Sequence, residues 1–165
     1  MKTLYLVRHA KSSWKYPRLD DFERPLNKRG RKNAPFMGSI LKKLKVAPDI
    51  IISSPANRAA TTARIIADTI DYPLEKIRYE ETIYATSEYD LLQVLQQLDD
   101  AVSQAMLVSH NPAITDLANS IGDTAISNIP TSGVCCINLD ISSWAKIGDQ
   151  HGKLKFFDFP KKHTS

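Results

Sequence analysis

The chain has 165 residues, of which 42% are hydrophobic, and a formal net charge of +4. That is enough apolar material for one core, so we expect a single domain spanning residues 1–165. No apolar stretch approaches the ~20 residues of a membrane span, and no apolar leader precedes the first strand-like run, so we expect a cytoplasmic protein without a membrane partner. The basic residues lack interleaved aromatic residues and any recognised nucleic-acid motif, which argues against a nucleic-acid partner.

The first third of the chain alternates strand-like and helical runs. Residues 3–7 are apolar and predict a strand, which a polar loop follows. Asn27 can cap a helix whose apolar positions recur at helical spacing, although Pro35 lies inside this stretch and predicts a kink or a late start. A second strand is predicted for residues 49–53, before Ser54 and Pro55, which read as the N-cap and the first residue of the next helix.

The same alternation continues toward the C-terminus and then changes. The pattern predicts a short strand near 77–80, a helix around 91–98, a strand at 105–108 and a helix around 114–121. After Pro130, residues 133–140 and 153–159 read as two strands around a turn, typical of an antiparallel edge. We therefore expect an α/β fold, a three-layer α/β/α sandwich whose central sheet is mostly parallel with an antiparallel edge.

Cationic side chains follow three of the predicted parallel strands. Arg8 and His9 come directly after the first strand, Arg58 comes soon after the second, and His110 follows the strand at 105–108. Because ligands bind at the carboxyl ends of the strands in open α/β sheets, these four side chains should meet in one pocket. Two arginines and two histidines suit a phosphoryl group, so inorganic phosphate or sulfate should also bind there.

The sequence shows no candidate site for a metal or another cofactor. The two cysteines, Cys135 and Cys136, are adjacent in an apolar run and have the spacing of neither a metal site nor a redox motif. No cluster of Asp, His and Cys has metal-ligand spacing either. We expect a site that needs no metal and no cofactor.

Four segments together resemble the histidine phosphatase superfamily, also called phosphoglycerate mutase-like: residues 6–12 (LVRHAKS), 25–30 (PLNKRG), 54–59 (SPANRA) and 109–112 (SHNP). The first resembles the Arg-His-Gly signature of the family, with Ala10 in place of the usual glycine. Ala10 would cost about 1 kcal/mol if the backbone there required a positive φ. The short chain and the His-Asn-Pro form resemble the short SixA-like branch, which implies a phosphoglycerate mutase-like fold.

The resemblance implies a mechanism. His9 would attack phosphorus and form a phosphohistidine that water hydrolyses, while Arg8 and Arg58 bind the non-bridging oxygens and His110 donates a further hydrogen bond. In the family, a carboxylate after the third strand protonates the leaving group, and Glu81 is the candidate here. Glu80 is the alternative, and strand alternation would direct only one of the two into the pocket.

The resemblance leaves the substrate open. It favours a phosphatase that acts on phosphohistidine in proteins, because the chain has no long insertion between its motifs to make a lid. The same open pocket would suit a broad-specificity phosphatase of small phosphate esters. A third alternative is a module that binds phosphorylated ligands without turnover, although such a module would be expected to lack the nucleophile.

Overall fold

The computed structural model describes residues 1–84 and 86–164, and in them six strands form one mixed sheet in the order β3-β2-β4-β1-β5-β6. The strands are β1 Lys2–Arg8, β2 Ile50–Ser53, β3 Arg78–Tyr79, β4 Gln104–Ser109, β5 Val134–Leu139 and β6 Lys153–Asp158. Strands β1 to β4 are parallel, whereas β5 is antiparallel to β1 and β6 is antiparallel to β5. The predicted parallel sheet with an antiparallel edge is confirmed.

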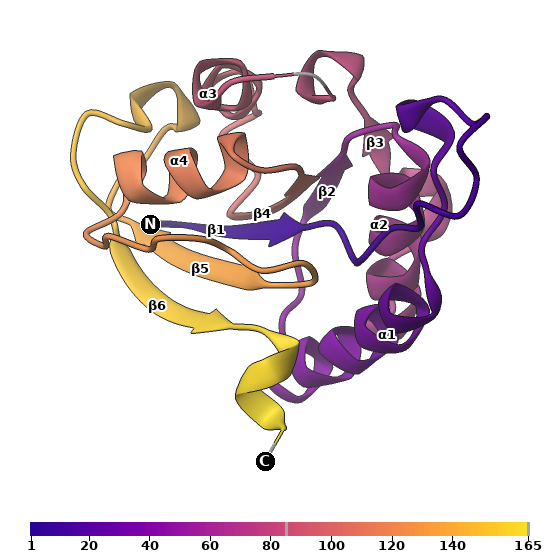
Figure 1. Ribbon diagram of the computed structural model, residues 1–165. Helices are drawn as coiled ribbons and strands as arrows, with labels where there is room; N and C mark the ends of the chain where they lie inside the picture. Colours follow the sequence, from indigo (N-terminus) through magenta and orange to yellow (C-terminus); the bar gives the residue numbers. More distant parts are fainter. Residues whose placement is uncertain (85, 165) are drawn as a thin grey trace.

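Helices cover both faces of this sheet (Figure 1). They are α1 Lys28–Lys43, α2 Asn57–Thr69, α3 Glu88–Gln96 and α4 Ala113–Ile121. Side chains of β1 alternate between the two faces: Tyr5 packs with the buried residues of α1 and α2, and Leu6 packs with those of α3 and α4. The three-layer α/β/α arrangement predicted from the sequence is therefore present.

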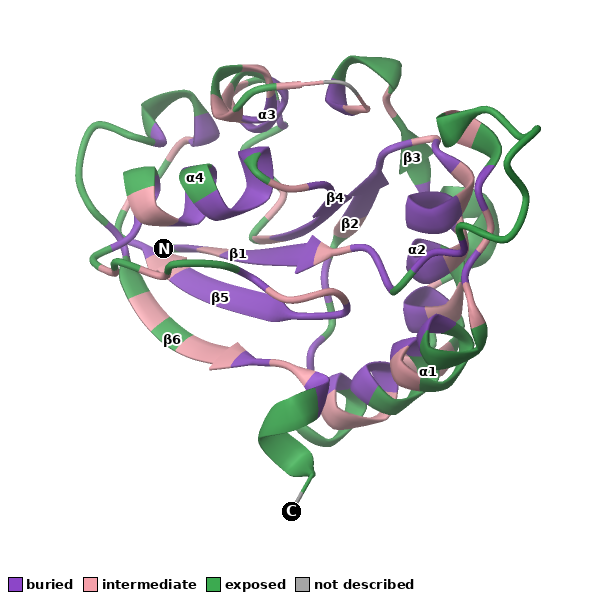
Figure 2. Cartoon of the chain, in the orientation of Figure 1, coloured by how far each residue is buried: buried purple, intermediate pink, exposed green. Residues whose placement is uncertain are grey.

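The central strands are buried on both faces, and Figure 2 shows them as almost continuously buried segments. Their sequences are accordingly apolar runs with no alternation, as expected for parallel strands between two helical layers. Strand β6 lies at the edge, and its first four residues alternate between exposed and partly buried. In the described part of the chain, no helix is long and apolar enough to cross a membrane.

The start of α1 agrees with the sequence, and that of α2 does not. The Asn27 side chain accepts a hydrogen bond from the Gly30 backbone N–H at 2.8 Å, which confirms the predicted cap. Because α1 begins at Lys28 and runs through Pro35, a late start is wrong. Helix α2 has Ala56 as its N-cap, so the predicted cap at Ser54 is also wrong. The Ser54 hydroxyl lies 2.7 Å from a ring nitrogen of His110 instead.

The register of the sheet brings the ends of three parallel strands to one level. Arg8, the last residue of β1, pairs with Ser109, the last residue of β4. Ser53, the last residue of β2, pairs with Val108. The residues that follow these strands therefore emerge next to one another at the carboxyl edge of the sheet.

Candidate active site

A cavity of about 210 Å³ lies at this carboxyl edge. The four residues predicted to converge all line it: Arg8, His9, Arg58 and His110. The others that line it come mainly from the loop after β1 and the segments near β4 and β5: Lys11, Ser12, Trp14, Arg24, Asn111 and Thr131. The predicted convergence of the strand ends is therefore present in the structure.

His9 is held in a defined orientation directly after β1. Its ring Nδ1 lies 2.8 Å from the carbonyl oxygen of Ala10. Since a carbonyl only accepts, Nδ1 carries the proton, and in the neutral ring Nε2 keeps its lone pair. Burial lowers the pKa of His9 to about 3; the bond to Ala10 opposes this shift, and the nearby His110 and arginines reinforce it. The imidazole is therefore neutral at neutral pH, as a nucleophile requires.

His110 lies against His9, with the two ring centroids 5.1 Å apart. Its Nε2 is 2.7 Å from the Ser54 hydroxyl, and its buried Nδ1 has no hydrogen-bond partner among the described residues. Burial, followed by the positive charge of Arg58, lowers the pKa of His110 to about 4. The second histidine is thus also neutral, and one of its ring nitrogens is unused by the protein.

The two predicted arginines are anchored by main-chain carbonyl groups. Arg8 donates from Nη1 to Ile129 O at 3.0 Å, and its buried Nε has no partner in the described part. Arg58, in the first turn of α2, donates from Nη1 to Asp21 O at 2.6 Å and from Nη2 to the Asp21 carboxylate at 2.9 Å. Their guanidinium groups are therefore fixed before any ligand arrives, which favours recognition of a phosphoryl group.

Two charged residues of the loop after β1 that were not predicted from the sequence, Asp21 and Arg24, belong to the site. Arg24 is buried, lines the cavity and stacks on Trp14, with its guanidinium carbon 3.3 Å from the ring centroid. Asp21 accepts hydrogen bonds from Arg24, Arg58 and Tyr84. The bond from Tyr84, followed by those from the arginines, holds the pKa of Asp21 below its usual range. No sequence signal separates these residues from solvated charges in the same loop.

The structure brings neither candidate acid into this cavity. Glu81 is exposed at the start of a short 3-10 turn, and Glu80 pairs with Arg78, with their charged atoms 2.6 Å apart. The expectation that one of these carboxylates points into the pocket is therefore not met. The physical reason is the sheet order, because β3 is a two-residue edge strand and β2 and β4 separate it from β1.

Ala10 is compatible with the backbone at the position where the family has glycine. It is not among the described residues that have a positive φ. Its side chain is fully buried, and its N–H donates to the Thr62 hydroxyl at 2.9 Å. The departure from the signature therefore carries none of the backbone cost that a left-handed conformation would impose.

The charges at the cavity suit an oxyanion. Three guanidinium groups line it, from Arg8, Arg24 and Arg58, together with two neutral imidazoles and no carboxylate among the described residues. Within residues 1–84 and 86–164, no group of three or more His, Cys, Asp or Glu side chains is placed to hold a metal ion. The arrangement can bind a phosphate group and present a neutral ring nitrogen to it.

Comparison with known proteins agrees with this chemistry. The model of the histidine phosphatase superfamily (branch 1) matches residues 4–82. An uncharacterized protein of Mycobacterium tuberculosis is 30% identical over 167 residues, which cover 94% of this chain and 100% of that protein. The SixA protein of Agrobacterium tumefaciens, for which phosphohistidine phosphatase activity is proposed, has a TM-score of 0.81 at 28% identity, over 96% of this chain and 98% of that one.

A second solved structure gives the same fold. It is the protein histidine phosphatase SixA in complex with tungstate, with a TM-score of 0.82 over 97% of this chain and 98% of that one. At 20% identity, this likeness concerns the fold alone.

Proposed function

Because this chain belongs to the histidine phosphatase superfamily and is a phosphatase of its short SixA-like type, we propose that it works through a covalent phosphohistidine formed on His9. The proposed catalytic domain is the whole chain, residues 1–165. The observation that carries this proposal is the His9 ring itself: Nδ1 is bound to the Ala10 carbonyl at 2.8 Å, so the neutral ring offers Nε2 to a phosphoryl group. Arg8, Arg58 and His110 lie around it in the same cavity.

In the first step, the Nε2 lone pair of His9 forms a bond to phosphorus while the bond to the leaving group breaks. The leaving group departs with that electron pair and takes a proton from solvent. In the second step, water attacks phosphorus, the N–P bond breaks and inorganic phosphate leaves, which restores the neutral imidazole. Arg8 and Arg58 bind the non-bridging oxygens in both steps, and His110 donates a further hydrogen bond, so that charge in the transition state is stabilised by fixed groups.

We propose that the substrate is phosphohistidine in a protein. Imidazole leaves more readily than an alkoxide, so such a substrate has less need of a general acid, and no carboxylate among the described residues lines the cavity. Trp14, which is 77% exposed, lines the rim, and Tyr16 of the same loop is also exposed. Exposed aromatic side chains beside a pocket suit contact with a folded partner. We propose that the protein acts in the cytoplasm, on histidine-phosphorylated signalling proteins.

A side-by-side turnover measurement tests this function. The substrates are a histidine-phosphorylated protein, an aryl phosphate and a series of alkyl phosphates, all in excess EDTA with His9→Ala as the control. We expect kcat/KM to be highest for the phosphohistidine protein and lowest for alkyl phosphates. If kcat/KM for the alkyl phosphates equals that for the phosphohistidine protein, the protein is a broad-specificity phosphomonoesterase instead. Tight binding of every substrate without turnover would establish a binding module.

A further inference from the structure

A second cavity adjoins the one that contains His9 and is larger, with a volume of about 310 Å³. The two cavities share Arg8, Lys11 and Thr131. The second one opens between the start of α1, which contributes Arg29 and Asn33, and the C-terminal 3-10 turn Pro160–His163, which contributes Lys161. It holds none of the residues that the proposed reaction uses except Arg8, so it is a separate space next to the reacting centre.

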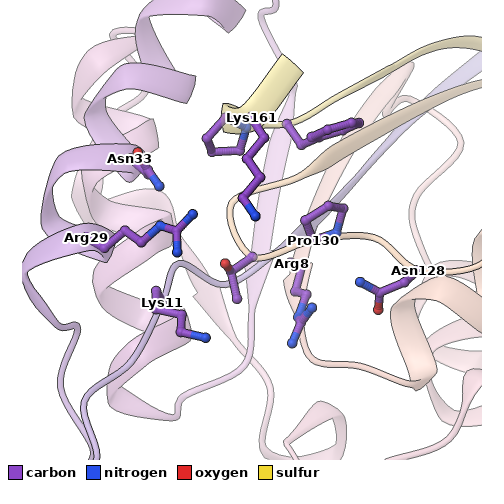
Figure 3. A pocket seen from close by; sticks show the side chains of 10 residues that line it. Arg8, Lys11, Arg29, Asn33, Asn128, Pro130 and Lys161 are labelled. Carbon is purple, nitrogen blue, oxygen red and sulfur yellow. The ribbon is translucent and has the colours of Figure 1, made fainter. Parts of the chain in front are cut away.

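This second cavity is strongly cationic. Arg8, Lys11, Arg29 and Lys161 line it, and none of the described residues that line it is acidic. In Figure 3 the charged ends of these four side chains surround the same space. The neighbouring Lys162, by contrast, donates to the Phe157 carbonyl and does not line the cavity. Like charges held together repel one another, and a bound anion relieves that repulsion.

The fold fixes the two walls of this cavity. Gly30 packs so closely on the Lys11 backbone that a Cβ at position 30 would collide with the Lys11 carbonyl oxygen, which brings Arg29 next to Lys11. On the other wall, His163 packs edge-on against Phe36 of α1, with ring centroids 5.5 Å apart. Pro160, in the same turn, is buried. The cationic side chains therefore extend from anchored backbone.

We propose that this cavity binds a second anionic group of the substrate, a phosphate or a carboxylate that is not transferred. The proposal rests on the proposed function, since it takes the transferred phosphoryl group to lie beside His9. Arg8 lines both cavities and would contact both anions, while Lys11, Arg29 and Lys161 would bind only the second. The substrate class is then a phosphorylated molecule with a neighbouring acidic group, such as a second phosphate or an acidic side chain beside phosphohistidine.

Aryl phosphates with a matched leaving group test this assignment. Their rings carry tethers of increasing length that end in a phosphonate, a carboxylate or a neutral amide, and the phosphonate cannot be transferred. We expect the wild-type kcat/KM to be about tenfold higher for at least one anionic tether than for the amide of the same length. A gain with the phosphonate alone identifies a phosphate subsite, and a gain with the carboxylate alone identifies a carboxylate subsite.

Two variants with the same change in charge locate the effect. In Arg29→Gln/Lys161→Gln, the preference for the anionic tether should fall to about twofold or less. In Lys32→Gln/Lys43→Gln, which alters two exposed lysines of α1 outside the cavity, the preference should persist. A preference that survives the first variant, or falls equally in both, would overturn the assignment.

Failure of this inference differs from failure of the proposed function. If the amide compounds are hydrolysed through His9 and no tether gives a preference, the second anion site alone is refuted. If none of the compounds is hydrolysed, turnover of the histidine-phosphorylated protein decides the proposed function, and calorimetric binding of the same compounds decides the subsite. In that binding measurement, equal affinity for the amide and the anionic tethers would also refute the second anion site.

Discussion

Arg58 donates hydrogen bonds to Asp21 from both of its terminal nitrogens: Nη1 bonds to the main-chain carbonyl at 2.6 Å and Nη2 to the carboxylate at 2.9 Å. The same carboxylate accepts from Arg24 at 2.8 Å. One acidic residue of the loop after β1 therefore orients two of the three arginines at the cavity. These two arginines are oriented before substrate binds, and the carboxylate of Asp21 offsets part of their positive charge.

Replacing Arg58 should impair catalysis for every leaving group, because its partner is the transferred phosphoryl group. We expect Arg58→Ala to lower kcat/KM on the order of 100-fold or more for aryl and alkyl phosphates alike. Arg58→Lys should recover little, since an ammonium group cannot reproduce the planar pair of donors. Asp21→Asn keeps the main-chain contact and should cost less, about tenfold or below. Wild-type kcat/KM in Arg58→Lys would contradict the assigned role.

The buried histidines should make folding stability depend on pH. Burial lowers the pKa of His9 to about 3 and that of His110 to about 4, from the ordinary 6.5. Between about pH 6.5 and pH 4 the unfolded chain binds protons that the folded chain does not, so stability falls as the pH falls through this window. Each histidine contributes at most about 1.4 kcal/mol per pH unit.

Urea unfolding across that pH range measures this dependence. His9→Asn removes one of the two histidines. The free energy of unfolding of this variant should therefore fall less steeply with falling pH than that of the wild type, with a slope lower by up to about 1.4 kcal/mol per pH unit. Parallel curves for the two proteins would mean that His9 is not held neutral by the fold.

Gly30 should tolerate no side chain. A Cβ at this position would collide with the Lys11 carbonyl oxygen, which accepts a hydrogen bond from the Asn27 N–H at 2.9 Å. Gly30→Ala must therefore shift α1 or the loop after His9, and we expect it to lower the free energy of unfolding by about 2 kcal/mol and to reduce kcat. Lys32→Ala on the exposed face of the same helix is the control and should change stability by less than about 0.5 kcal/mol. Equal effects of the two substitutions would rule out this close contact.

The sequence predicted the parts of the site that follow regular structure. Apolar runs located the parallel strands, and the rule that ligands bind at their carboxyl ends placed Arg8, His9 and His110 together. Arg58 could be assigned to the same site because α2 begins soon after β2. These positions depend on short-range patterns and on the common direction of parallel strands, both of which can be seen in one sequence.

The rest depends on contacts between distant segments. Asp21 and Arg24 belong to a loop without periodicity, and only its path across the cavity gives them partners. Ser54 was expected to cap α2, but α2 begins only at Asn57, and the Ser54 hydroxyl lies against the His110 ring. Lys161 reaches the second cavity only because the C-terminal turn packs on α1. Tertiary contacts of this kind leave no local signal in the sequence.

Glu81 should have little effect on turnover, since it is exposed and does not line the cavity with His9. We expect Glu81→Gln to keep kcat within about twofold of the wild type for both aryl and alkyl phosphates. The comparison of leaving groups decides the matter, because loss of a general acid slows poor leaving groups selectively. A large loss confined to alkyl phosphates would show that Glu81 reaches the substrate and acts as the acid.

In the proposed mechanism His9 carries the phosphoryl group, and rapid quenching of the enzyme with radiolabelled substrate tests this most directly. Under denaturing alkaline conditions, we expect an acid-labile label that maps to the peptide containing His9. The label should be absent from His9→Ala, whose fold is verified by circular dichroism. Label on His110, or turnover by His9→Ala at a rate near that of the wild type, would contradict the account.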